Sequence, residues 1–204
     1  YGVNVVMAVP GGLVIGGFVN TAGGFSAVNV ARWDGAIWSS LGEGLDGEVL
    51  GLAAAGDRIV AVGSFTGSGS ASVNGIAAWD GGAWSGALGE GLERRPVRAV
   101  AARGDTIYVG GDFTAIGGVS ARGVARWNGV AWQALGEGLD GEVRALMLSG
   151  TDVYLGGAFA VAGGGSSHNF ARWDASGLVP VRLLGFVAER SGAGNRGVIG
   201  ASGS

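Results

Sequence analysis

Four copies of one sequence unit follow each other along this chain of 204 residues, and this repetition restricts the fold more than any other feature. A Trp followed by Asp or Asn recurs with spacings of 46, 48 and 46 residues, and a Gly-x-Phe triplet recurs with spacings of 47, 48 and 46. Such regular spacing indicates a repeat architecture, with units near 3–48, 49–96, 97–142 and 143–188 and a Gly- and Ser-rich tail at 189–204. The first Trp of each unit is Trp33, Trp79, Trp127 or Trp173, and a second Trp follows five residues later at Trp38, Trp84 and Trp132.

Each unit predicts four short strands, and the third unit shows them best. The segments "VRAVAA" (97–102), "TIYVGGDF" (106–113), "RGVARW" (122–127) and "VAWQAL" (130–135) are rich in β-branched and aromatic residues or alternate in polarity. An Asn-Gly pair between the last two segments is a strong hairpin signal. Since no segment keeps a helical period of 3.6 over ten residues, we expect an all-β fold.

The connectors between units contain a glycine pattern that must be distinguished from a nucleotide-binding loop. "LGEGLDGEV" occupies 41–49 and returns at 135–143, and it includes the Gly-x-Gly-x-x-Gly spacing of dinucleotide-binding proteins. That fingerprint needs a helix after the glycines, because the pyrophosphate lies on a helix N-terminus. A strand is expected here instead, and the connector of the second unit has Arg94 in place of the last Gly. The stretch is therefore interpreted as a link between units.

Four-stranded units repeated every 40 to 50 residues predict a β-propeller, in which sheets stand radially around a central channel. One such sheet cannot bury both of its faces alone, whereas stacked sheets bury each other. The recurring Trp residues supply the bulk that fills the space between sheets.

The same segments resemble the kelch and galactose-oxidase-like propeller repeat, of the type found in bacterial secreted and surface proteins. "IYVGG" (107–111) and "VYLGG" (153–157) match its hydrophobic second strand that ends in two glycines, and Trp127 with Trp132 match its aromatic pair. The resemblance covers about residues 3 to 188. It implies kelch-like blades, but propellers of this kind host binding, scaffolding and catalysis alike.

The number of blades leaves the closure of the ring open. Kelch-like propellers more often have six or seven blades, so four units form a small closed propeller, a slice of a longer array or one part of an assembly of chains. The first unit holds its own four strands, from 3–9 to 36–41. We therefore expect the first and last blades to meet directly or through a partner chain, without a swapped strand.

Composition excludes several classes of function. The net charge is −3 and no basic stripe is present, so nucleic acid is not an expected partner. No apolar run approaches eighteen residues, so no membrane span is expected. All thirteen basic residues are Arg and the chain has no Cys, which fits a bacterial protein that is secreted or displayed on the cell surface.

Catalytic chemistry finds little support in the sequence. His168 is the only His, it lies in a Gly-Ser loop, and no nucleophile is paired with it. The copper chemistry of galactose oxidase requires Tyr, Cys and His ligands, which a chain with one His and no Cys does not supply. The expectation is a protein that is not an enzyme and has no cofactor.

Acidic residues of the connectors are the one candidate metal site. Calcium takes six to eight oxygen ligands, and glycine-rich loops expose carbonyl oxygens, although the spacing of an EF-hand is missing. Solvated turn residues are the simpler interpretation, and paired carboxylates of a glycosidase are a further alternative. The candidate calcium residues are Glu43, Asp46, Glu48, Glu137, Asp140 and Glu142.

Variable loops after the second strand of each unit are the expected recognition surface, because loops on a rigid scaffold commonly carry binding. The leading hypothesis is a non-catalytic extracellular propeller module that binds or scaffolds a protein or glycan partner at this loop face. The alternative is a structural building block that self-associates or packs in a larger surface assembly. A carbohydrate-active enzyme is the third hypothesis. The candidate binding residues are Asn20, Phe25, Asn74, Arg122, His168 and Asn169.

Overall fold

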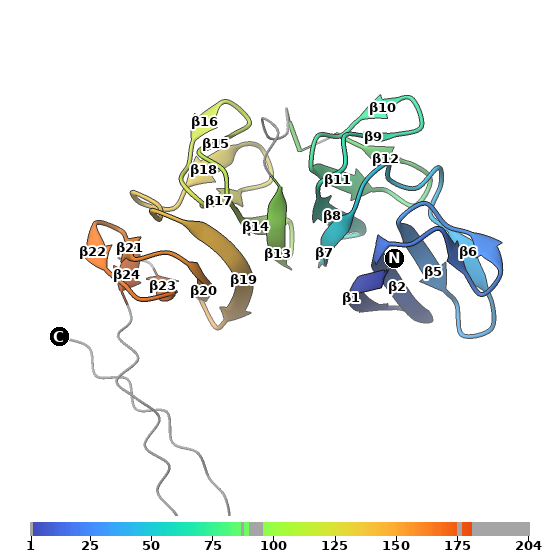
Figure 1. Ribbon diagram of the computed structural model, residues 1–204, viewed down its shortest axis with the longest axis horizontal. Helices are drawn as coiled ribbons and strands as arrows, with labels where there is room; N and C mark the ends of the chain where they lie inside the picture. Colours follow the sequence, from blue (N-terminus) through green and yellow to red (C-terminus); the bar gives the residue numbers. More distant parts are fainter. Residues whose placement is uncertain (1, 87, 90–95, 175–176, 181–204) are drawn as a thin grey trace, which may run out of the picture.

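The structure, a computed structural model, describes residues 2–86, 88–89, 96–174 and 177–180, and its regular elements are all β-strands (Figure 1). Four antiparallel four-stranded sheets follow one another, each built from consecutive stretches of the chain. The first sheet contains β1 (Gly2–Val9), β2 (Gly12–Phe18), β5 (Val30–Trp33) and β6 (Trp38–Ser40), and the second contains β7 (Val49–Ala55), β8 (Arg58–Gly63), β11 (Ile76–Trp79) and β12 (Trp84–Ser85). The third contains β13 (Val97–Arg103), β14 (Thr106–Gly111), β17 (Val124–Trp127) and β18 (Trp132–Ala134), and the fourth contains β19 (Glu142–Ser149), β20 (Asp152–Ala158), β23 (Phe170–Asp174) and β24 (Gly177–Pro180).

The four sheets stand side by side in an open arc (Figure 1). The first strands β1, β7, β13 and β19 lie on the concave side, where each contacts the first strand of the next sheet. The first and fourth sheets lie at opposite ends of the arc, so among the described residues they do not meet directly and do not close a ring (Figure 1). Of the alternatives that the sequence left open, contact through a partner chain stays a prediction. Within the described residues no sheet borrows a strand from another unit. The tail at 189–204 lies outside the described residues.

Hydrophobic side chains fill the three spaces between successive sheets. Val14 and Val30 of the first sheet pack with Leu52 and Ala61 of the second. Equivalent clusters join the second sheet to the third and the third to the fourth. We call the face that each sheet turns toward the following sheet its forward face, and the opposite one its backward face. The core is therefore divided into layers, and each layer needs two sheets.

The repeated Trp motif closes the outer hairpin of the first three sheets. Trp33 and Trp38 pair across β5 and β6 with ring centroids 5.4 Å apart, and the two later pairs lie at 5.5 Å. Between them, the Asp34 carboxylate accepts hydrogen bonds from the backbone N–H groups of Ala36 and Ile37. The same turn occurs at Asp80 and Asn128. The Asn-Gly pair therefore belongs to a four-residue loop, and the fourth strand is shorter than the sequence predicts.

The loops after the second strands contain small hairpins that the sequence analysis did not predict. In the first unit Gly23 and Gly24 have φ values of 55° and 85°, which suit the tight turn of a two-residue hairpin loop. One residue of each hairpin is buried, for example Ala22 and Ile116. The four hairpins are β3 (Thr21–Ala22) with β4 (Phe25–Ser26), β9 (Gly67–Ser68) with β10 (Ala71–Ser72), β15 (Ala115–Ile116) with β16 (Val119–Ser120), and β21 (Val161–Ala162) with β22 (Gly165–Ser166).

The connector "LGEGLDGEV" (41–49) runs from one sheet across the hairpin of the next, and a strand follows it, as expected. Its leucines Leu41 and Leu45 are buried between the sheets. Gly44 has a φ of 70°, and a Cβ atom there would lie 2.4 Å from the carbonyl oxygen of Val28. The glycines therefore permit close backbone contact within the protein.

Candidate functional site

A β-bulge at one equivalent position in each first strand directs four side chains toward the concave side of the arc. The register between first and second strands shifts between Val3 and Val5, and it shifts at the equivalent point of β7, β13 and β19. A bulge re-aims the extra residue, and bulges are frequent beside functional sites. The extra residues are Asn4, Leu50, Arg98 and Arg144, and all four line one hollow of about 400 Å³ together with Glu142.

Charged groups in this hollow are already paired. The Glu142 carboxylate accepts a hydrogen bond from Nε of Arg144 at 2.7 Å and another from Nε of Arg98. The bond from Arg144 and the positive charge of Arg98 lower the pKa of Glu142, and partial burial opposes them. The carboxylate therefore holds two guanidinium groups with their remaining N–H donors available in the hollow.

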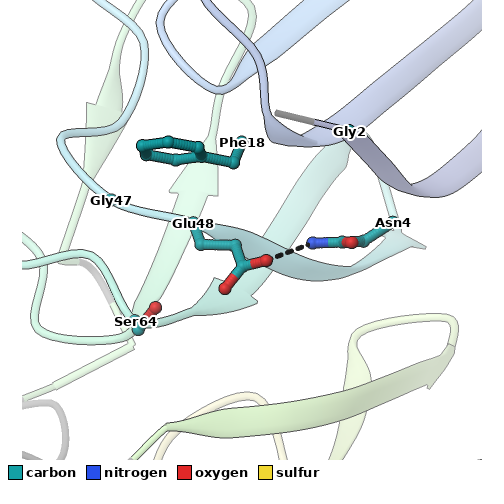
Figure 2. A pocket seen from close by; sticks show the side chains of 6 residues that line it. All are labelled: Gly2, Asn4, Phe18, Gly47, Glu48 and Ser64. Carbon is teal, nitrogen blue, oxygen red and sulfur yellow. Dashed lines mark hydrogen bonds between the residues drawn. The ribbon is translucent and has the colours of Figure 1, made fainter.

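A second hollow, of about 600 Å³, adjoins the first through Asn4 (Figure 2). The Asn4 amide donates one hydrogen bond to Oε1 of Glu48 at 2.9 Å and one to the carbonyl oxygen of Val49 at 3.0 Å. The Phe18 ring lies beside this pair with an exposed fraction of 45% (Figure 2). We define the rim site by the side chains of the two hollows that can contact a ligand: Asn4, Phe18, Glu48, Arg98, Glu142 and Arg144.

The rim site is suited to recognition by hydrogen bonds. An amide, two carboxylates and two guanidinium groups present both donors and acceptors in planar side chains. The Phe18 ring adds an apolar surface. Ser64 also lines the second hollow, but neither hollow contains a His that could activate it. The lowered pKa of Glu142 makes its carboxyl group a poor proton donor near neutral pH.

Two of the candidate calcium residues have structural partners instead. The Asp46 carboxylate accepts hydrogen bonds from the backbone N–H of Thr66 at 2.6 Å and from its hydroxyl at 2.8 Å. The Asp140 carboxylate accepts two from the backbone N–H groups of Ala160 and Val161, each at 2.8 Å. These bonds tie each connector to the hairpin of the next sheet. They lower the pKa of both aspartates, against the opposing effect of burial, which is the largest single influence on Asp46.

The remaining acidic candidates are dispersed. Glu48 and Glu142 belong to the rim site, whereas Glu43 and Glu137 lie over the hairpin turns at Gly69 and Gly164. Across the part of the chain that the structure describes, no group of three or more His, Asp or Glu side chains could hold a metal ion.

The loop residues that the sequence analysis proposed for binding are exposed and do not line the rim site. Phe25 belongs to β4 and has an exposed fraction of 53%. Asn74 and Asn169 have φ values of 30° and 63°, so their backbone conformation accounts for an Asn at these turns. Asn20, Arg122 and His168 are exposed in the loops between second and third strands.

Sequence reasoning missed the rim site, although one signal was present. Asn4, Arg98 and Arg144 are polar residues at the same position near the start of three largely apolar first strands.

Comparison with known proteins supports the fold without assigning a family. No protein-family model matches the chain, and no curated protein matches it. A solved structure of the computationally designed Ika8 protein matches 84% of this chain with a TM-score of 0.54 and 20% identity. The computationally designed Ika4 protein matches 85% of it with a TM-score of 0.53 and 16% identity. The chain spans 45% of the Ika8 chain and 91% of the Ika4 chain.

Among the residues that the structure describes, there is no helix with the length and apolar character that would cross a membrane.

Proposed function

We propose that this chain is a section of a kelch-like β-propeller that acts as a non-catalytic, extracellular or cell-surface binding module, and that its ligand is a glycan held at the rim site. The arrangement of the sheets supports the propeller interpretation. Their first strands gather on the concave side and their outer hairpins point away from it (Figure 1). The aromatic pairs of the outer hairpins match the kelch-like pattern of the sequence.

The repeated bulge carries this proposal. It directs Asn4, Arg98 and Arg144, three polar side chains from three sheets, into one hollow, where a structural role would be served equally well by apolar residues. Sheet packing alone does not require Arg98 and Arg144 to converge on one carboxylate. Convergent polar groups in a concave site are typical of ligand binding.

The chemistry of the rim site favours a glycan. Sugar hydroxyl groups both donate and accept hydrogen bonds, and the amide, carboxylate and guanidinium groups of the site complement them. The ring of Phe18 offers an apolar face on which the C–H surface of a sugar can pack. The charges of Arg98 and Arg144 are matched by those of Glu48 and Glu142, so a neutral ligand suits the site better than a strongly charged one.

A glycan array tests the proposal. The full chain, fluorescently labelled at an added terminal tag, is expected to bind a defined subset of neutral oligosaccharides. Arg98→Gln and Phe18→Ala are each expected to weaken that binding at least tenfold, because each removes a direct contact. Arg103→Gln is the matched control, since it removes an exposed Arg outside the rim site and outside the candidate binding loops. Absence of binding to every glycan, or equal loss in the control, would contradict the proposal.

A further inference from the structure

Residues at the two ends of the arc are exposed although their counterparts inside it are buried. Val49, Val97 and Val143 occupy one equivalent position near the start of β7, β13 and β19, and each has an exposed fraction of 0%. Val3 occupies the same position in β1 and has an exposed fraction of 49%. Val6 on the backward face of the first sheet and Met147 on the forward face of the fourth are 62% and 58% exposed. The end faces therefore carry the side chains of an interface without its second half.

One internal contact shows how the missing half would fit. A Cβ atom at Gly16 would lie 2.5 Å from Val49, and one at Gly110 would lie 2.4 Å from Val143. Glycine at these positions therefore lets the valine of the next sheet press against the backbone. Gly156 is the equivalent residue of the fourth sheet, and among the described residues the nearest atom to a Cβ there is 3.9 Å away. The forward face of the fourth sheet thus has an open space at Gly156 that can hold a valine side chain, and we call this space the seat at Gly156.

Residues that make the aromatic contacts between the third and fourth sheets also have equivalents at the two ends of the arc. Arg126 on the forward face of the third sheet lies 5.9 Å from the ring of Trp173 in the fourth, and the ring of Tyr108 lies 6.3 Å from the same Trp. Arg172 and Tyr154 are the equivalent forward-face residues of the fourth sheet. In the first sheet the residue equivalent to Trp173 is Trp33.

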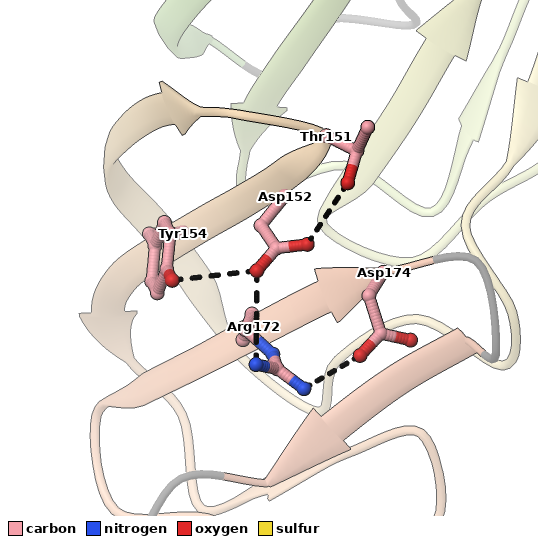
Figure 3. A network of polar contacts seen from close by, with 5 residues as sticks. All are labelled: Thr151, Asp152, Tyr154, Arg172 and Asp174. Atoms are coloured by element: carbon pink, nitrogen blue, oxygen red, sulfur yellow. Dashed lines mark hydrogen bonds and ion pairs between the residues drawn. The ribbon is translucent and has the colours of Figure 1, made fainter.

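The forward face of the fourth sheet is ordered for such a contact (Figure 3). The Arg172 guanidinium lies 3.6 Å from the carboxylate of Asp152 and 2.6 Å from that of Asp174. Its Nε atom is buried and, among the described residues, has no hydrogen-bond partner. Tyr154 stacks on Phe170 with ring centroids 6.1 Å apart. These contacts fix the Arg and the Tyr before any partner arrives.

We infer that the forward face of the fourth sheet binds the backward face of the first sheet of a second copy of this chain. The same contact made twice closes a ring of two chains and eight sheets. Val3 of one copy then occupies the seat at Gly156 of the other, and Arg172 and Tyr154 cover its Trp33. A second copy is the fitting partner because its first sheet carries, on the backward face, the equivalents of the residues that contact a forward face inside the arc. The match to 45% of the Ika8 chain agrees, since that chain has the length for a second arc of this size.

The mass of the full chain in solution is the first test. Light scattering after gel filtration at micromolar concentration is expected to give twice the chain mass of 20.1 kDa. A heterologous contact that fails to close would form open filaments instead. A single-chain mass or a series of larger species would each overturn the inference.

Cysteine cross-linking tests the geometry, with no background because the chain has no Cys. The double variant Val3→Cys with Gly156→Cys is expected to form a covalent dimer under mild oxidation. The Cβ positions of the equivalent Gly and Val pairs lie 2.9 and 3.0 Å apart inside the chain, and a shift of about half an ångström brings such a pair to the distance that a disulfide needs. Each single variant is expected to stay uncross-linked. A disulfide within one chain would show that the arc closes on itself and would contradict the inference.

A small substitution should separate the two copies without disturbing either. Gly156→Val fills the seat for Val3 but meets only ordinary contacts within its own chain, so we expect a monomer with an unchanged β-sheet circular dichroism spectrum. Gly82→Val is the matched control, since Gly82 lies in an exposed turn where an added Cβ meets only the Asp80 carboxylate, at an ordinary contact distance of 3.7 Å, and it should leave the dimer intact. Val3→Arg provides a second test should Gly156→Val alter the fold. A dimer that persists in both Gly156→Val and Val3→Arg would refute the proposed contact.

Discussion

At two unit boundaries a single carboxylate links the connector to the next unit by hydrogen bonds. Asp46 joins the first connector to the hairpin of the second sheet, and Asp140 does the same between the third and fourth. From the sequence, solvated turn residues are the simpler interpretation of these aspartates, and calcium ligands are an alternative. Neither interpretation includes the hydrogen bonds, because the hairpin that supplies the donors is distant in sequence from the connector.

Removal of the Asp46 carboxylate should weaken the contact between the first two units. Asp46→Ala leaves the N–H and hydroxyl of Thr66 without their acceptor, and we expect a loss of about 1 kcal/mol in the free energy of unfolding, since water can replace part of the contact at this exposed position. Urea denaturation provides the measurement. Glu43→Ala, which changes a nearby connector carboxylate, should have little effect. A loss below 0.3 kcal/mol for Asp46→Ala would contradict this role.

Acid should destabilise the protein through the same residues. The pKa values of Asp46, Asp140 and Glu142 are lowered in the folded state. A group with a lowered folded pKa binds fewer protons when folded, so its stabilising contribution is complete above the unfolded pKa, near 4, and is lost as the pH falls through the folded value. The urea midpoint should therefore be flat between pH 6 and 8 and should fall below pH 4. For Glu142→Gln the fall should be smaller, and an identical profile would rule out its contribution.

Elements as a whole follow the sequence closely where they are long and repeated, and poorly where they are short or irregular. Trp33, Trp79, Trp127 and Trp173 lie in strands, and Trp84 and Trp132 are buried, as expected, whereas Trp38 is only partly buried. The sequence did not predict the two-residue strands of the hairpins, because they are too short to show a hydrophobic period. It did not predict the bulges, because a register shift is a property of two paired strands together.

The outer Trp residues should be important for stability as well as for bulk. The indole N–H of Trp132 donates a hydrogen bond to the carbonyl oxygen of Leu88 at 2.6 Å, across the boundary between units. Trp132→Ala removes this bond and a buried ring, and we expect a loss of about 3 kcal/mol. Gln133→Ala, at the exposed neighbouring position, should cost less than about 0.5 kcal/mol. Equal midpoints for the two variants in urea would contradict the prediction.

The whole molecule is an arc of sheets rather than a closed ring, and the sequence left that choice open. Repeat length and strand pattern determine what one sheet looks like, but the number of sheets in a ring depends on the angle between neighbours, which small differences in interface packing set. Val49 is buried and Val3 is exposed although they are identical residues at one repeat position, so the residue type alone does not tell whether a preceding sheet covers it.

Metal removal should leave the whole molecule unchanged. A ligand present at 100 times its dissociation constant stabilises a fold by about 2.7 kcal/mol, which for a domain of this size corresponds to roughly 5–10 °C in melting temperature. Asp46 and Asp140 already use their carboxylates within the protein, so we expect EDTA to shift the melting temperature by less than 1 °C. Calorimetry with and without EDTA measures this, and a drop of several degrees that calcium reverses would establish a metal site.

Each sheet draws its four strands from one uninterrupted stretch of chain, and this has a consequence for how the protein forms. Every strand pairing joins residues close in sequence, so contact order is low for an all-β protein and pairing need not await distant segments. The strands of one sheet can pair soon after their unit leaves the ribosome, and the sheet gains its core layer when the next unit packs on it. Synthesis and folding then advance together, one unit at a time, and a chain that stops at a unit boundary keeps the core layers between the sheets already made.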